Sequence, residues 1–272
     1  MTETAAHAKI NLSLVVGPLR PDGKHEVATV LQRIDLSDTV ALHPTTTEGI
    51  AVEGFEDTIV KRALTMFSEV ARAPLAWSAR IEKRIPVAAG LGGGSSDAAA
   101  ALRLANGMVE EPLAAEALHE VAARVGADVP FFLRGGTQLA TADGSELEAI
   151  DLPLDYAVVL VLPDDAHKES TATVYRRFDD RGGERGFTER RAALLDALAR
   201  AKLPTDIAEL PRDDLASSPL AAELERLGAF RADVSGAGPA VYALFESRAG
   251  AEAAAQALVG ATRAWVLRPV SG

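Results

Sequence analysis

The stretch PVAAGLGGGSSDAAAAL spans residues 86–102 and joins a glycine-rich loop to the start of a helix. Four of the five residues from Gly90 to Gly94 are glycine, so backbone N–H groups can turn toward one point without Cβ collisions. Ser95 or Ser96 is predicted to be the N-cap of a helix formed by the alanine run. The free N–H groups and the dipole of a helix start favour an anion, so the stretch predicts a phosphate site.

Two better-known phosphate loops do not fit these residues. The Walker loop ends in Gly-Lys-Ser/Thr, and no lysine follows the glycines here. The dinucleotide fingerprint G-x-G-x-x-G, begun at Gly90, needs a glycine where Ser95 stands. A tight turn that only caps a helix is the alternative interpretation. Four glycines, two serines and a helix start in one run favour the phosphate loop over it.

Composition limits the classes of function. A length of 272 residues fits one large or two ordinary domains, and a hydrophobic share of 48% is ample for a core. A net charge of −11 argues against broad binding to nucleic acid, although it permits one small phosphorylated ligand. The absence of cysteine excludes disulfides and thiolate metal sites. No apolar run is long enough to span a membrane and no secretory leader is evident, so we expect a cytoplasmic protein.

The segment of residues 8–16 alternates apolar and other side chains, which predicts a half-buried strand. Lys9 and Asn11 then share one face, although a solvated lysine is the alternative for Lys9 taken alone. A Pro-Asp-Gly turn follows, and His25 stands just past it, after Lys24. Farther along, Asp128 lies between a helix end and a proline, beside large apolar residues. A carboxylate in that setting has either a partner, a capping role or a catalytic function.

The remaining pattern predicts an α+β protein with a boundary near Asp151. Predicted strands cover residues 27–34, 38–43, 49–53, 75–82, 156–162, 230–234, 240–245 and 264–267, with two more within 135–150. Predicted helices cover residues 57–70, 95 onward, 112–126, 170–178, 188–201, 213–227 with a break near Pro219, and 249–259. The order of elements after the boundary is typical of a ferredoxin-like domain. The domains are thus predicted as 1–150 and 151–272.

Three stretches together resemble the three motifs of the GHMP kinase superfamily. They are residues 8–25, 86–102 and 234–239. The resemblance extends over nearly the whole chain. The start at residues 8–12 and the segment of residues 126–132 are most similar to members that phosphorylate a hydroxyl of a cytidine-diphosphate-linked polyol in the non-mevalonate route to isoprenoid precursors.

The resemblance implies a fold and a set of roles. It implies an N-terminal domain like domain 2 of ribosomal protein S5, a ferredoxin-like C-terminal domain and an active site in the cleft between them. Lys9 and Asp128 match the catalytic pair, with Asp128 accepting the proton of the attacking hydroxyl. The residues matching the ATP phosphate loop are Pro86, Val87, Ala88, Ala89, Gly90, Leu91, Gly92, Gly93, Gly94, Ser95 and Ser96. Those assigned to the polyol substrate are Asn11, Lys24, His25, Thr171, Tyr175 and Gly236.

The implied cofactors are ATP and Mg²⁺, the latter held largely by phosphate and water, with the Ser96 hydroxyl as a further ligand. Phosphoryl transfer depends mainly on positioning and charge stabilisation, which suits these residue types. The implied partner is a small molecule, with neither nucleic acid nor membrane involved, and the protein is expected to be a monomer or a homodimer.

The sequence departs from the family pattern near the substrate base. Lys24 stands where the family has a tyrosine that stacks on the cytosine, whereas Tyr175 matches a second aromatic wall. Other departures are Thr58, Asp213 and Ala237. Two alternatives stay open: another GHMP kinase acting on a substrate such as homoserine or mevalonate, and a catalytically silent nucleotide-binding protein of the same fold.

Overall fold

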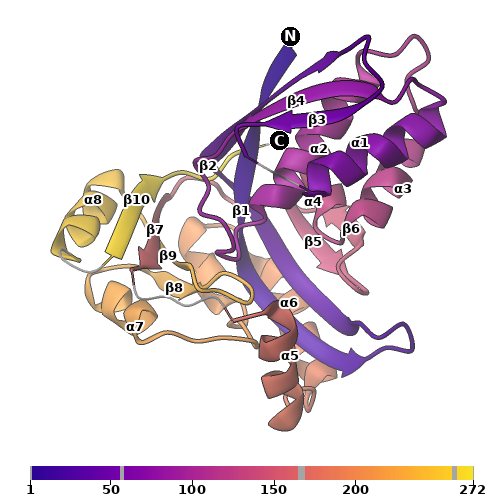
Figure 1. Cartoon of the computed structure of the whole chain (residues 1–272). Helices are drawn as coiled ribbons and strands as arrows, with labels where there is room; N and C mark the ends of the chain where they lie inside the picture. The colour runs from indigo at the N-terminus through magenta and orange to yellow at the C-terminus, as the bar shows by residue number, and fades with distance from the viewer. Residues whose placement is uncertain (1, 56–57, 165–168, 259–261, 272) are drawn as a thin grey trace. The chain divides into compact units, whose positions relative to one another are not determined.

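The computed structural model describes residues 2–55, 58–164, 169–258 and 262–271 (Figure 1). The chain forms two compact units. Unit 1 comprises Met1–Ala8, Leu36–Val87 and Gly92–Gly135. Unit 2 comprises Lys9–Asp35, Ala88–Leu91 and Gly136–Gly272. These units are composed differently from the predicted domains 1–150 and 151–272, whose boundary stays a prediction.

Two long strands contribute residues to both units, β1 (Thr2–Leu19) and β2 (His25–Pro44). Most of β1 is buried, because its apolar residues alternate with side chains that are themselves enclosed. The strand β2 replaces the two separate strands predicted at residues 27–34 and 38–43. It continues through Asp35, Leu36 and Ser37 between them, so one strand contributes residues to both units.

Unit 1 combines short strands with four helices. The strands are β3 (Gly49–Glu53) and β4 (Ala76–Glu82), and the helices are α1 (Thr58–Ala71), α2 (Gly93–Asn106), α3 (Ala115–Val125) and α4 (Val129–Arg134). β4 pairs antiparallel with the end of β2 and parallel with β3. The helices gather beside β3 and β4 (Figure 1). The alanines of α2 are buried almost without exception, which lets neighbouring helices approach closely.

Unit 2 contains the remaining elements. Its strands are β5 (Thr137–Thr141), β6 (Glu146–Ala149), β7 (Ala157–Pro163), β8 (Arg231–Val234), β9 (Val241–Phe245) and β10 (Thr262–Leu267). Its helices are α5 (Thr171–Asp180), α6 (Phe187–Arg200), α7 (Pro219–Arg226), α8 (Arg248–Ala257) and the 3₁₀ helix η1 (Pro204–Glu209). Within this unit, β5 pairs with Thr29–Gln32 of β2 and with β6.

The ferredoxin-like prediction is confirmed by the sheet of order β10-β7-β9-β8, in which every neighbouring pair is antiparallel. The continuous apolar run of β7 is buried along both faces at the centre of this sheet. Helices α7 and α8 supply apolar side chains to the core beneath it. The predicted residues Asp57 and Val259, at helix ends, lie outside the described residues.

The prediction that Ser95 or Ser96 is the N-cap of α2 is wrong. The helix begins at Gly93, and its N-cap is Gly92, which has a left-handed backbone with φ of 69° and no side-chain cap. Glycine adopts this conformation without a Cβ clash, so the chain turns into the helix before it reaches the serines. Ser95 and Ser96 therefore lie inside the first turn.

Two predicted helix starts are also wrong, because side chains bind the backbone there. The helix predicted from Pro112 begins at Ala115, since the Asn106 amide bonds both the N–H and the carbonyl of Leu113. The helix predicted from Asp213 begins at Pro219. There the Asp213 carboxylate accepts the N–H groups of the second and third residues after it, a turn that competes with a helix.

No helix in the described ranges is both long and apolar enough to cross a bilayer.

Candidate active site

Lys9 of β1 is buried, and its ammonium is held by two oxygens of unit 2. Nζ donates to Asn11 Oδ1 at 2.6 Å and to the carbonyl oxygen of Gly90 at 2.9 Å. The Lys9 backbone N–H donates to Leu91 O at 3.0 Å. Lys9 is 5% exposed, which excludes the alternative of a solvated strand lysine. The predicted shared face of Lys9 and Asn11 is confirmed.

The Asn11 side chain is itself fixed. Its Nδ2 donates to Thr29 Oγ1 at 2.8 Å, and the Thr29 hydroxyl donates to the carbonyl of Ser13 at 2.7 Å. The amide oxygen is therefore the atom turned toward Lys9. Because an amide oxygen carries no full charge, it orients the ammonium without neutralising it.

The loop after β8 closes over the same residues. Ser235 Oγ donates to Gly90 O at 3.1 Å and accepts the N–H of Asn11 at 3.3 Å. A Cβ on Gly90 would lie 2.2 Å from the carbonyl oxygen of Ser235, and one on Gly236 would lie 3.1 Å from Asn11 Oδ1. Both glycines have positive φ, so neither tolerates a side chain. Sequence reasoning named Gly236 but missed Ser235, whose signal was its place in the third motif.

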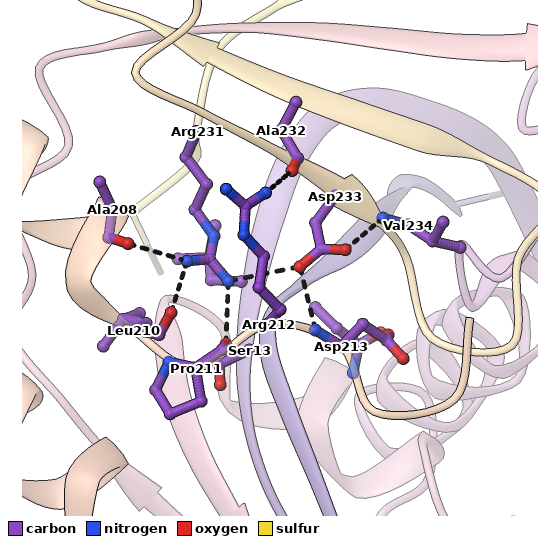
Figure 2. Close-up of polar contacts among 12 residues, drawn as sticks. Ser13, Ala208, Leu210, Pro211, Arg212, Asp213, Arg231, Ala232, Asp233 and Val234 are labelled. Atoms are coloured by element: carbon purple, nitrogen blue, oxygen red, sulfur yellow. Dashed lines mark hydrogen bonds and ion pairs between the residues drawn. The ribbon is translucent and has the colours of Figure 1, made fainter. Parts of the chain in front are cut away.

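A buried polar cluster lies next to this loop in unit 2 (Figure 2). The Arg231 side chain is fully buried and donates to the carbonyl oxygens of Leu210 at 2.6 Å and Pro211 at 2.9 Å. Asp233 accepts the N–H groups of Asp213 at 3.0 Å and Val234 at 2.9 Å. Arg231 and Asp233 thereby fix the segment that leads into α7.

Asp213 is the exception within this cluster. Its Oδ2 is buried and has no hydrogen-bond partner in the part of the chain that the structure describes. Burial, together with the negative charge of Asp233, raises the pKa of Asp213 well above its usual range, whereas the positive charge of Lys9 acts in the opposite direction. This chain therefore carries a titratable group near Lys9.

Within unit 1, the glycine stretch leads from β4 into α2. The first turn of α2 presents the N–H groups of Gly93, Gly94 and Ser95, which have no acceptor within their own helix. Val87 is 62% exposed, whereas Ser96 is 2% exposed. Of the stretch, Ala88–Leu91 belongs to unit 2, where Ala240 donates its N–H to Ala89 O at 3.2 Å. Such an array of N–H donors at a helix start can bind phosphate oxygens.

Asp128 is the N-cap residue of α4 in unit 1. Its side chain is half-buried and makes no capping hydrogen bond. The next four residues, Val129 to Phe132, are buried and anchor the short helix. On α2, Arg103 Nη1 donates to the carbonyl oxygen of Phe132 at 2.5 Å and holds α4 in place. Asp128 and Lys9 lie in different units, so their pairing stays a prediction.

Of the residues assigned to the polyol substrate, Asn11 and Gly236 lie beside Lys9, whereas His25 and Tyr175 belong to a second group in unit 2. The rings of His25 and Tyr175 lie 4.8 Å apart, and His25 Nε2 lies 2.8 Å from Asp179 Oδ1. Thr171 is the exposed first residue of α5, one turn before Tyr175. The structure thus brings His25 and Tyr175 together, and their role in substrate binding stays a prediction.

Lys24 has no ring to stack on His25 or Tyr175. Its Nζ instead forms an ion pair with Asp143 Oδ2 at 2.5 Å. Partial burial opposes ionisation of Asp143, yet hydrogen bonds from Lys24 and Ser145 lower its pKa to about 2. The lysine side chain is 57% exposed. Solvent therefore screens the lysine end of this pair, while the Asp143 carboxylate is mostly buried.

Among the described residues, no cluster of three or more His, Cys, Asp or Glu side chains could hold a metal ion. A Mg²⁺ ion commonly takes most of its ligands from water and substrate phosphates, so a single hydroxyl such as that of Ser96 fits this mode.

Known proteins resemble the chain over nearly its whole length. Residues 58–136 match the model of the GHMP kinases N terminal domain, and residues 216–262 match that of the GHMP kinases C terminal. The 4-diphosphocytidyl-2-C-methyl-D-erythritol kinase of Desulfitobacterium hafniense (strain Y51) is 37% identical over 92% of this chain and 89% of its own.

Solved structures agree with these matches. A crystal structure of 4-(cytidine 5'-diphospho)-2C-methyl-D-erythritol kinase covers both chains fully, with a TM-score of 0.80 and 30% identity. A crystal structure of mevalonate kinase also covers both chains fully, with a TM-score of 0.79 but 14% identity, which reflects the fold alone.

We predict that Asp213→Asn raises stability at neutral pH. The pKa of Asp213 is higher in the folded than in the unfolded chain, so folding becomes less favourable as pH rises above about 4. The uncharged amide of Asn avoids the cost of burying a charged carboxylate. The free energy of unfolding at neutral pH should rise by about 1.4 kcal/mol for each unit by which folding raises the pKa of Asp213. Denaturant unfolding from pH 4 to pH 8 measures the difference, which should grow with pH.

The matched control is Asp196→Asn on the exposed face of α6. It should change stability little at any of these pH values. A gain for Asp213→Asn that is the same at pH 4 and pH 8 would contradict the assignment of a raised pKa.

Proposed function

The chain belongs to the GHMP kinase family, and from that premise we propose that it phosphorylates the 2-hydroxyl of 4-diphosphocytidyl-2-C-methyl-D-erythritol with ATP. It is an ATP-dependent phosphotransferase with an alcohol as acceptor. The observation that carries the proposal is the buried Lys9, held by Asn11 and by the glycine stretch, in a chain similar over its length to kinases of that name.

Lys9 suits a role in stabilising charge. Transfer of a phosphoryl group spreads negative charge over the transferred oxygens, and a fixed cation counters it without reorganising. Lys9 Nζ donates hydrogen bonds to two neutral oxygens, Asn11 Oδ1 and Gly90 O, which orient the ammonium without cancelling its charge.

Asp128 suits the role of the base that accepts the proton from the attacking hydroxyl. A carboxylate free of capping hydrogen bonds at the start of a well-packed helix is both available and fixed in direction. Val129 to Phe132 of α4 are buried, and Arg103 donates a hydrogen bond to the carbonyl of Phe132. Positioning of this kind contributes much of the rate in phosphoryl transfer.

ATP is expected at the glycine stretch, Pro86 to Ser96. The N–H groups at the start of α2 would bind its phosphate oxygens, and Mg²⁺ would be held by those phosphates, water and the Ser96 hydroxyl. Bound magnesium would neutralise part of the charge on the phosphates. The chain's own contribution is to supply donors that are fixed before ATP arrives.

The cytidyl part of the acceptor is expected against His25 and Tyr175, with Asn11, Lys24, Thr171 and Gly236 around it. The ring of Tyr175 supplies one aromatic face for the base. A cytoplasmic location, a monomeric or homodimeric state and the non-mevalonate pathway remain predictions for this chain.

The test of this function is phosphate transfer from ATP to three acceptors offered in parallel. We expect turnover with 4-diphosphocytidyl-2-C-methyl-D-erythritol and none with mevalonate or homoserine. Turnover only with mevalonate or homoserine would keep the kinase chemistry and overturn the proposed acceptor. ATP binding without transfer to any of the three would favour the silent nucleotide-binding alternative.

We predict that Asp128→Asn removes most turnover and leaves ATP binding largely intact. The amide keeps the shape of the carboxylate but cannot take the proton, and loss of general-base catalysis costs about 100- to 10,000-fold in rate. Steady-state kinetics and ATP titration measure the two effects separately. Lost ATP binding with little change in turnover would refute the role of Asp128.

We predict that Lys24→Tyr tightens binding of the cytidyl substrate. A ring at this position would stack on the base, and stacking contributes about 1–3 kcal/mol at most. Titration with the acceptor in the absence of ATP measures the change, and Lys24→Met separates the ring from the loss of the Asp143 pair. An affinity no better than that of Lys24→Met would mean that the base is held in another way.

A further inference from the structure

Lys83 lies just beyond the end of β4, between two carboxylates of unit 1. Its Nζ lies 2.5 Å from Asp38 Oδ2 and 2.8 Å from Asp97 Oδ2. Both carboxylate side chains are 0% exposed, and that of Lys83 is 15% exposed. The ring of Phe55 covers another side of the ammonium, 5.5 Å from its centroid. The ammonium is therefore enclosed and held in one place.

Asp38 also fixes the chain that follows Lys83. Its Oδ1 accepts the N–H groups of Arg84 at 2.5 Å and Ile85 at 2.9 Å. These are the last residues before the glycine stretch begins at Pro86. One buried carboxylate thus binds the lysine through one oxygen and the backbone that enters the loop through the other.

Asp97 places the same lysine against the start of α2. Asp97 is the fifth residue of this helix, one turn beyond Gly93. A Cβ on Gly93 would lie 3.2 Å from Lys83 Nζ and 3.1 Å from a methyl carbon of Ile85. The ammonium therefore packs on the first residue of the helix whose N–H groups face the expected phosphates.

The charges of this cluster matter for an anion site. The three side chains carry two negative charges and one positive charge, in a buried place where a field is poorly screened. Burial works against the charged form of Lys83, but the hydrogen bonds that it donates to Asp38 and Asp97 raise its pKa, so the ammonium stays protonated. Without it, two negative groups would lie near the helix end that is to receive a polyphosphate.

We propose that Lys83 is a positioning residue for ATP: it cancels the charge of Asp97 and ties the start of α2 to the end of β4, which makes the glycine stretch able to bind phosphates. This inference rests on the proposed function, because it takes the stretch as the ATP site. Lys83 is assigned no contact with ATP, and it acts through the charge and the placement of the helix start.

The experiment compares ATP and adenosine binding by calorimetry in four proteins. These are the wild type, Lys83→Met, Asp97→Asn and the double variant Lys83→Met/Asp97→Asn. The amide of Asp97→Asn can still accept the hydrogen bond from Lys83, so this variant removes charge and keeps geometry. The matched control is Arg80→Ala, which breaks the exposed Arg80–Glu82 pair on the same strand and should leave binding unchanged.

Lys83→Met should weaken ATP binding by about tenfold, the size expected for one added like charge near a protein surface, with adenosine affinity little changed. Asp97→Asn should bind ATP at least as tightly as the wild type. The double variant should return to within about threefold of the wild type, because it has the same net charge in the cluster.

Weaker ATP binding in Asp97→Asn would overturn the proposal. So would an equal loss of adenosine affinity in Lys83→Met, which would indicate a contact with the base or a general loss of structure. If Lys83→Met fails to fold, the order of Asp97→Asn, the wild type and the double variant still tests the sign of the effect.

The binding comparison needs no phosphate acceptor. If the proposed acceptor is wrong, the role proposed for Lys83 can still be correct. If the wild type transfers phosphate to the proposed acceptor but Asp97→Asn binds ATP poorly, only the role of Lys83 is refuted.

Discussion

The carbonyl oxygen of Gly90 is the point on which the arrangement in unit 2 depends. It accepts hydrogen bonds from the Lys9 ammonium and from the Ser235 hydroxyl, and the same hydroxyl binds the backbone of Asn11. Three stretches far apart in the sequence are thereby held at one atom. Because a Cβ at Gly90 would collide with the Ser235 carbonyl, the contact exists only if this residue is glycine. The glycine is needed for packing between motifs as much as for the turn itself.

Much of this fold was predictable because its signals are local. Alternation gave the first strand and placed Lys9 beside Asn11, and the unbroken apolar run of β7 predicted a strand buried on both faces. The order of the later elements predicted the ferredoxin-like sheet, which the pairing of β7, β9 and their neighbours confirms. The glycine stretch was correctly predicted to join a strand to a helix.

The wrong predictions share a cause, which is that one residue's side chain or backbone freedom changes the conformation of its neighbours. Gly92 turns the chain into α2 before the serines, and Asn106 holds Leu113 out of a helix. Local patterns also cannot show contacts that form across long separations. The buried charges of Lys83 and Asp38 are 45 residues apart, and nothing near either residue indicates that they meet.

Lys24 and Thr171 stand at open, solvent-exposed positions, in contrast to the buried surroundings of Lys9. The Lys24 side chain is 57% exposed and Thr171 is exposed, whereas Lys9 and Asn11 are each 5% exposed. Substitutions at the open positions cost little in folding, and so natural variation can accumulate there first. Under the proposed function, acceptor preference could change at these positions at little cost in folding while the buried surroundings of Lys9 stay the same, and directed evolution of a new acceptor preference would start there.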